Sequence, residues 1–465
     1  MKIGVHAATI ALLAASASAQ AVTLNPRGLG QALVYPYYTV LKNQDTLISV
    51  GNASGIGKVA KVVVQEGRNG RPALYFNLFL SPHDVWTARL SRSDDGGARL
   101  FTNDSSCTYP DLVPDGTPMR VEGYVQVTPG QLYPGDGGPT GLERTREGML
   151  TIIAMGDVVP GSDLEATITH VGSGQPGAGV PACDAAVIGF HDFADLTAPG
   201  NDLYGSASVV NVGEGTFFAY AADALADFTD VAIDRGTSQE RAPSFDFAHS
   251  SASTQGGAIA HVADDTGATR ALDYANPASA VSAVYMAESI ANEYLIATGL
   301  GANTDWVVTF PTRSHHVDAL YTDAAIAPFV EAASEGLSAV AVVAQAYDQE
   351  EGSAAEPGAE TTFDLPYQVN VLSVGAPLAG AGTSRVFGST LSTPVAAFGE
   401  AGWMQLGLGG AGHVLSGEAG GVLLSGLPVT GFMVYNIINS NAAPGRLANY
   451  GGTFAHRSRF AEAVE

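Results

Sequence analysis

The chain has 465 residues and is poor in charge, above all in positive charge. Only 14% of its residues are charged, against about 25% in ordinary soluble domains. The 21 lysines and arginines face 46 aspartates and glutamates, which gives a formal net charge of −25. Binding to nucleic acid needs clustered lysines and arginines that release counterions from phosphates, so this balance argues strongly against a nucleic-acid partner.

Long apolar runs are also absent after the first residues. The two longest candidates, residues 337–346 and 422–438, are too short for a membrane-spanning helix or are interrupted by Gly and Pro. No transmembrane span is therefore expected in the mature chain.

The first nineteen residues have the pattern of a secretory signal peptide. Lys2 supplies a basic start, residues 5–15 are mostly apolar, and residues 17–19 (ASA) form an A-x-A cleavage site. The pattern predicts removal of residues 1–19, a mature chain beginning at Gln20, and export to the cell surface, the extracellular space or the periplasm. The alternative is a short buried N-terminal helix, but its flanks match a signal peptide better.

Cysteine is nearly absent, with only Cys107 and Cys183. In an oxidising compartment an even number of cysteines normally means a bridge, so one disulfide between the two is expected. A pair of reactive thiols is the alternative, but no C-x-x-C or neighbouring His supports it.

Short runs rich in Val, Tyr, Phe and Thr, separated by turn residues, predict a mainly β fold built of antiparallel β-sandwich units. Five successive strands are expected first, at residues 32–40, 46–52, 58–65, 74–80 and 85–90. Further strands are expected at residues 119–127, 149–155, 165–171, 207–212, 216–221, 305–310, 368–374, 403–408, 422–424 and 431–437.

The length and the loop-like tracts predict more than one packed unit. We expect an N-terminal sandwich-like region at residues 20–200 and a middle β region at 201–366 with one or two helices. The helices are expected at residues 280–298 and 318–335, where apolar residues have a helical spacing. Residues 367–465 are expected to form β strands that could complete the N-terminal sandwich.

Catalytic and cofactor motifs are missing or lack their context. No G-x-S-x-G or H-E-x-x-H occurs, and the G-x-G-x-x-G at residues 407–412 is followed by neither a helix nor a suitably placed acidic residue. No cofactor is expected. The weak metal candidates are His316 and Asp318, which would face the same side of an extended strand. A solvated polar loop is the alternative.

The sequence is compatible with two other kinds of site. An aromatic group could bind carbohydrate, although alternation places about half of it in the core: Tyr35, Tyr37, Tyr38, Tyr75, Phe76, Phe79 and Trp86. Paired carboxylates for hydrolysis of polysaccharide or peptide are also possible, but no feature of the sequence selects a pair among 46 acidic residues.

Several segments together resemble an uncharacterised family of secreted proteobacterial proteins, usually described as hypothetical or cell-surface proteins. The segments are residues 25–31 (NPRGLGQ), 35–39 (YPYYT), 80–88 (LSPHDVWTA), 304–312 (TDWVVTFPT) and 447–452 (LANYGG). The resemblance spans both ends of the mature chain and implies one continuous architecture and an exported location. It carries no catalytic residues.

The sequence therefore favours a non-enzymatic envelope or cell-surface protein that acts through adhesion or assembly, with other envelope proteins or surface glycans as partners. A secreted hydrolase that uses paired carboxylates is the alternative. A smooth surface with an open sheet edge would favour the first, and a deep cleft with two close carboxylates the second.

Export is tested directly by cell fractionation. The expected result is a mature chain outside the cytosol whose amino terminus, read by mass spectrometry, is Gln20. Recovery of the intact, uncleaved chain from the cytosol would contradict the prediction.

Overall fold

The computed structural model describes residues 20–121, 135–170, 179–189, 193–233, 242–350, 360–375, 384–417, 422–439, 443–446, 448–460 and 462–463. The predicted signal peptide, residues 1–19, lies outside the described residues, as do most of the strand expected at 119–127 and the end of that at 165–171. The fold is mainly β with antiparallel sheets and few helices, which confirms the predicted fold class. No helix among the described residues is long and apolar enough to cross a membrane.

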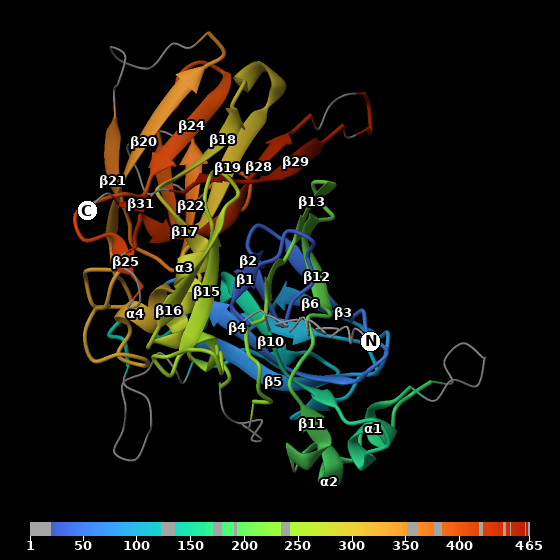
Figure 1. The fold of residues 1–465 in the computed structure, drawn as a ribbon. Coiled ribbons are helices and arrows are strands. Elements are labelled where there is room, and N and C mark those ends of the chain that lie inside the picture. Colours follow the sequence, from blue (N-terminus) through green and yellow to red (C-terminus); the bar gives the residue numbers. More distant parts are fainter. Residues whose placement is uncertain are drawn as a thin grey trace, which may run out of the picture.

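The first sandwich is made of an eight-stranded and a six-stranded sheet (Figure 1). The eight-stranded sheet contains β1 (Thr23–Leu24), β14 (Asp223–Ala226), β2 (Ala32–Thr39), β10 (Glu147–Val158), β4 (Lys58–Glu66), β5 (Pro72–Leu80) and β8 (Thr108–Tyr109), with β11 (Leu196–Thr197) paired to β10. The six-stranded sheet contains β13 (Thr216–Ala221), β12 (Leu203–Asn211), β3 (Asp45–Asn52), β6 (Val85–Arg92), β7 (Ala98–Phe101) and β9 (Thr117–Pro118). All five strands expected at the start of the chain are present.

The second sandwich is made of two five-stranded sheets. One contains β21 (Thr361–Leu365), β20 (Val340–Asp348), β24 (Ala401–Gly407), β18 (Ser289–Leu295) and β30 (Arg457–Arg459). The other contains β23 (Ser392–Val395), β22 (Val369–Val374), β19 (Ala302–Thr309), β28 (Thr430–Ile437) and β29 (Tyr450–Ala455). The strands after residue 367 thus pair with β18, β19 and β20, whereas β12 to β14 join the first sandwich.

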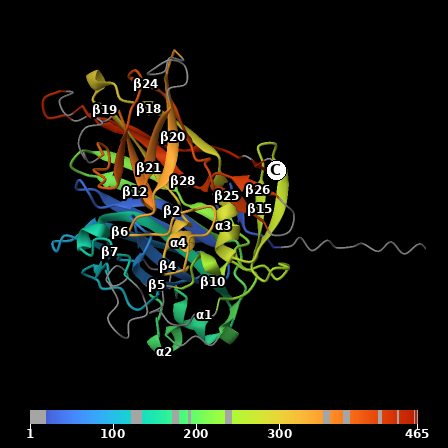
Figure 2. The same cartoon turned by 90° about the vertical axis from the view of Figure 1, so that its left-hand side faces the viewer.

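Smaller elements fill the space around the sandwiches. The short sheets are β15 (Ala258–Ala263) with β16 (Thr269–Tyr274), β17 (Met286–Ala287) with β27 (Leu427–Pro428), and β25 (Val414–Ser416) with β26 (Leu423–Ser425) and β31 (Glu462–Ala463). The helices are α1 (Asp163–Ile168), α2 (Ala185–Ile188), α3 (Pro277–Tyr285) and α4 (Arg313–Val317), with 3-10 turns η1 (Leu142–Arg146), η2 (Phe193–Asp195), η3 (Phe245–Phe247) and η4 (Thr298–Leu300). Helices α1 and α2 lie at the end of the first sandwich that points away from the second (Figure 2).

The eight-stranded sheet is buried on both faces. Alternate residues of β2, β4 and β10 pack into the core of the first sandwich. The residues between them join a second core, to which β19, β22, β28, α3 and the β15–β16 hairpin contribute. This double burial explains why β4 reads as a largely apolar run rather than as an alternating strand. A third core lies between the two sheets of the second sandwich.

The strand expected at residues 165–171 and the long helix expected at residues 280–298 were wrong. Residues 163–168 form helix α1 because Ser162-Asp163-Leu164-Glu165 has the S-x-x-E pattern of a capping box. The hydroxyl of Ser162, the N-cap, accepts from the Glu165 amide, and the Glu165 carboxylate accepts from the amide of Gly161, one residue earlier. The helix expected at residues 280–298 ends at Tyr285, and β18 follows. Ile290 and Tyr294 are four residues apart, a spacing that places side chains on one face in a strand as well as in a helix.

The region expected to form a second helix, residues 318–335, is a series of turns and coil after α4. It contains a cis peptide bond between Ala327 and Pro328, and proline interrupts helical hydrogen bonding. The helices of the middle region are therefore α3 and the short α4.

Cys107 and Cys183 form a disulfide with an S–S distance of 2.02 Å, which confirms the predicted bridge. Cys107 precedes edge strand β8 and is 1% exposed, while Cys183 lies just before α2. The amide of Cys183 also donates to the carbonyl of Thr167 at the end of α1. The bond therefore fixes the α1–α2 segment to the edge of the eight-stranded sheet.

Replacing both cysteines by alanine should lower the free energy of unfolding of the protein by about 2–4 kcal/mol, because the bridge closes a long loop in the unfolded chain. The measurement is urea denaturation of the Cys107→Ala/Cys183→Ala variant beside the oxidised wild type. Reduced wild type should match the variant. Identical midpoints for all three would show that the bridge does not stabilise the fold.

Candidate functional site

The two predicted metal ligands lie at the seam between the sandwiches. His315 and His316 belong to helix α4, so the expectation of an extended strand was wrong. Nε2 of His316 lies 2.7 Å from the hydroxyl of Ser282 in α3, while Asp318, directly after α4, contacts a residue of the first sandwich. The helical turn thus directs the two side chains to different partners.

Asp318 is the partner of Arg71, which lies directly before β5, at the end of the connection between β4 and β5. The guanidinium of Arg71 donates to both carboxylate oxygens of Asp318, at 2.8 Å from Nε and 2.6 Å from Nη2. The amides of Asn69 and Leu320 also donate to this carboxylate. Arg71 and Asp318 are both fully buried. Asp318 is therefore an element of the seam rather than an available metal ligand.

A second arginine completes this seam network. Arg144 donates to both oxygens of Glu66, at 2.8 and 3.0 Å, and also to Asp136. Glu66 in turn accepts from the backbone amides of Arg68, Asn69 and Arg71. We call Glu66, Arg71, Asp136, Arg144 and Asp318 the seam network. It is a set of buried carboxylates and guanidiniums in which every charge has an opposite charge within reach.

Burial and pairing shift the pKa values at the seam in different directions. Burial alone would raise the pKa of Asp136, but the hydrogen bonds and charge of Arg144 outweigh it and hold the pKa below its usual value. Asp136 thus stabilises the fold fully above its unfolded pKa of 3.8, and this contribution is lost as the pH falls through the lower folded value.

Burial is the main influence on the basic groups of α4. Burial lowers the pKa of Arg313 to about 9 and that of His316 to about 3, the latter with a further contribution from His315. His316 is therefore neutral at physiological pH. Within the part of the chain that the structure describes, no three His, Cys, Asp or Glu side chains are grouped so that they could hold a metal ion. The seam network is thus suited to fixing the sandwiches together.

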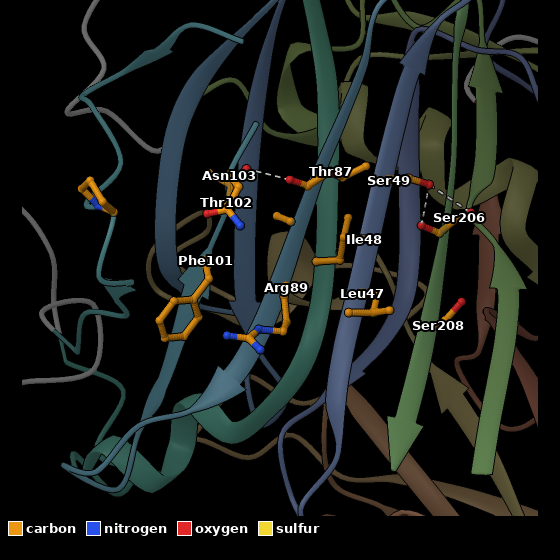
Figure 3. Close-up of a pocket in the computed structure, with 12 residues that line it drawn as sticks. Leu47, Ile48, Ser49, Thr87, Arg89, Phe101, Thr102, Asn103, Ser206 and Ser208 are labelled. Atoms are coloured by element: carbon orange, nitrogen blue, oxygen red, sulfur yellow. Dashed lines mark hydrogen bonds between the residues drawn. The ribbon is translucent and has the colours of Figure 1, made fainter. Parts of the chain in front are cut away.

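A different feature is available to a ligand: a hollow of about 560 Å³ on the outer face of the six-stranded sheet (Figure 3). Strands β3, β6, β7 and β12 form its floor. The segment after β7 and the turn before β9 form its rim. Its lining is Leu47, Ile48, Ser49, Thr87, Ala88, Arg89, Phe101, Thr102, Asn103, Pro114, Ser206 and Ser208. We call this surface the outer hollow.

The outer hollow combines hydrogen-bonding groups with one cation. The hydroxyls of Ser49 and Ser206 lie 3.1 Å apart across neighbouring strands. The central carbon of the Arg89 guanidinium lies 4.8 Å from the centre of the Phe101 ring. Nη1 of the same guanidinium lies 3.9 Å from Oδ2 of Asp45. None of the residues that line the hollow in the structure is a His, Cys, Asp or Glu. Its chemistry is that of a binding surface without a general acid, a general base or an activated nucleophile.

The aromatic group considered for carbohydrate binding lies almost entirely in the core. Tyr35, Tyr37, Tyr38, Phe76, Phe79 and Trp86 are each at most 1% exposed, and Tyr75 is half-buried. Strands β2 and β5 belong to the sheet that is buried on both faces, so alternation does not bring half of the group to the surface. The residues of the outer hollow were not found from the sequence because isolated Ser and Thr on strands carry no motif.

Two carboxylates of the first sandwich, those of Asp157 and Asp202, both contact the ammonium group of Lys58. Nζ of Lys58 lies 2.5 Å from Asp157 and 2.9 Å from Asp202, and Lys58 is fully buried. The ammonium group of Lys58 compensates the charge of one of the two carboxylates and occupies the space between them that a glycosidic bond would need. This pair therefore does not provide the paired-carboxylate site of a hydrolase.

No protein-family model matches this chain, and no curated protein and no solved structure matches it either.

Replacing Arg71 by methionine should lower the free energy of unfolding by about 3–5 kcal/mol, because it leaves the buried Asp318 without its partner. The matched control is Arg99→Met, which breaks an exposed ion pair with Asp95 and should cost no more than about 1 kcal/mol. Denaturant unfolding measures both. Adding Asp318→Leu to Arg71→Met should recover part of the loss, and equal losses for Arg71→Met and Arg99→Met would contradict a stabilising seam.

Proposed function

We propose that this protein is an exported, non-enzymatic component of the bacterial envelope or cell surface that acts through adhesion or assembly and binds surface glycans in its outer hollow. The outer hollow carries the proposal, because it is a wide, concave sheet face lined by hydroxyls, an amide and a guanidinium. Such groups donate to and accept from the hydroxyls of a sugar.

The shape of the outer hollow suits an extended ligand. It crosses four neighbouring strands, so a chain of sugars could lie across β12, β3, β6 and β7 and meet Ser206, Ser49, Thr87 and Thr102 in turn. Leu47 and Phe101 provide apolar contact at the Arg89 end. Other envelope proteins remain the competing partner class, and the test below separates the two.

Three features support the exported location. The sequence begins with a signal-peptide pattern, the surface relies little on charge, and the chain carries a buried disulfide of the kind that persists in oxidising compartments. The resemblance to secreted proteobacterial proteins points in the same direction.

A secreted hydrolase is less well supported by the arrangement of carboxylates. Glu66 and Asp136 are bound by Arg144, and Asp157 and Asp202 are bound by Lys58. The outer hollow, in the residues that line it, has no carboxylate. Binding without catalysis is therefore the function that this surface supports best.

Replacing Thr87 by tryptophan should fill the outer hollow and weaken adhesion of the mature protein to envelope fragments about tenfold or more, a loss of about 1.4 kcal/mol. Arg89→Ala should weaken it to a lesser degree. The matched control is Arg92→Ala, an exposed arginine near the end of the same strand that does not line the hollow. Binding is measured on immobilised envelope fragments.

Pretreatment of the fragments identifies the partner class. Periodate oxidation of sugars should abolish binding, whereas digestion with protease should leave it unchanged. The reverse result would assign the hollow to an envelope protein. Full binding by Thr87→Trp would show that the outer hollow is not the contact surface.

A further inference from the structure

A second cavity lies at the junction of the two sandwiches, away from the outer hollow. It has a volume of about 450 Å³ and receives residues from both sides. The first sandwich contributes Asn25, Pro26, Pro36 and residues 219–224, and the second contributes residues 430–432 together with Thr453 and Ala455. Ligand sites occur preferentially at such interfaces between packed units. We call it the junction cavity.

Asp223 is the acidic group of the junction cavity. It lies where the chain crosses from β13 in one sheet to β14 in the other. Its Oδ2 accepts from the hydroxyl of Thr430, at the start of β28, at 2.5 Å. Close by, the hydroxyl of Thr309, which pairs with Thr430 in the sheet, donates to the carbonyl of Pro36 at 2.7 Å. The position of Asp223 is thus set from both sandwiches.

Asp223 has no cationic partner among the described residues. In the part of the chain that the structure describes, no ion pair within 4 Å joins its carboxylate to a Lys, Arg or His. Arg27, in the loop that supplies Pro26 and Gly28 to the rim, is exposed and forms no ion pair with Asp223 in the part of the chain that the structure describes. This contrasts with the seam network, in which each buried carboxylate meets an arginine.

The groups around Asp223 leave it as the titrating charge of the cavity near neutral pH. Burial raises the pKa of Asp223 to about 6, against the hydrogen bond from Thr430 that lowers it. Burial raises the pKa of Tyr220 and Tyr285 above their usual values, so both stay neutral. Burial lowers the pKa of His456, the residue after Ala455, to about 4, and its ring lies against the carbonyl of Val307.

An aromatic surface stands beside the carboxyl. The rings of Tyr220 and Phe432 are stacked with centroids 4.7 Å apart, and the hydroxyl of Tyr220 donates to the carbonyl of Tyr37. Both residues line the cavity, but Phe432 is 2% exposed and belongs to the core, so Tyr220 is the ring that a ligand can contact. An aromatic face attracts a cation and covers the alkyl chain that carries it. No second Asp or Glu lines the cavity among the described residues, so it does not offer paired-carboxylate hydrolysis.

From this arrangement we propose that the junction cavity is a binding site for a primary alkylamine, whose ammonium group pairs with Asp223 and whose alkyl chain lies along Tyr220. The ammonium group of the ligand pairs with Asp223 as the arginines of the seam network pair with their buried carboxylates. The inference does not depend on the glycan proposal, because the outer hollow contributes no residue to this cavity.

The test uses n-hexylamine as the probe and n-hexanol as its uncharged counterpart, titrated into the mature protein by isothermal calorimetry. Hexylamine should bind at pH 7.5 and hexanol should not. Binding of hexylamine should weaken about tenfold at pH 5, because Asp223 becomes protonated while the ammonium keeps its charge.

Asp223→Asn keeps the shape of the side chain and should abolish binding of hexylamine. The matched control is Asp364→Asn, on the exposed edge strand β21, which should bind as the wild type does. Ala221→Trp, at an exposed position of the cavity lining, should also block the site while Asp223 stays in place. No binding to the wild type, equal binding of hexanol, or full binding by Asp223→Asn would each overturn the proposal.

Discussion

The burial of the eight-stranded sheet on both faces is the constraint on which the rest of the structure depends. A sheet covered on one side can send its charged side chains to water, but β4 and the turn after it carry Lys58, Glu66 and Arg71 inside the protein. A buried charge is tolerated only when it is paired and hydrogen-bonded. Lys58 finds its partners in the same sandwich, whereas Arg71 finds Asp318 in the second.

Because of this constraint, the second sandwich covers one face of the eight-stranded sheet and forms hydrogen bonds with buried polar groups of the first sandwich. Glu147, at the start of β10, accepts from the hydroxyls of Ser389 and Thr390, and Gln368 contacts the backbone of Arg68 and Pro311. Polar contacts with defined geometry fix the relative position of two apolar surfaces that could otherwise pack in several ways. The outer sheets are free of this constraint, and the outer hollow lies on one of them.

The features that could be predicted from the sequence are those specified by residues close together in the chain or by an unambiguous residue count. The strands and the Cys107–Cys183 bond were predicted because alternation, turn residues and the cysteine count are local or unambiguous features. The capping box at Ser162 was also a local signal and could have been recognised. The pairing of Arg71 with Asp318 joins residues 247 positions apart, and the outer hollow gathers single hydroxyls from four strands. Neither leaves a pattern in the sequence, because both arise only from the packing of whole sheets.

The order of the strands along the chain has a consequence for biogenesis. The last strand of the first sandwich ends at Ala226, but the elements that cover the other face of its eight-stranded sheet come later: the β15–β16 hairpin from Ala258, helix α3, and strands of the second sandwich between Ala302 and Ile437. A newly synthesised chain would thus hold part of this apolar surface open to solvent until most of its length is available for folding. Such a surface invites aggregation or capture by a chaperone. The two sandwiches are therefore better understood as one cooperative folding unit than as independent modules joined in series.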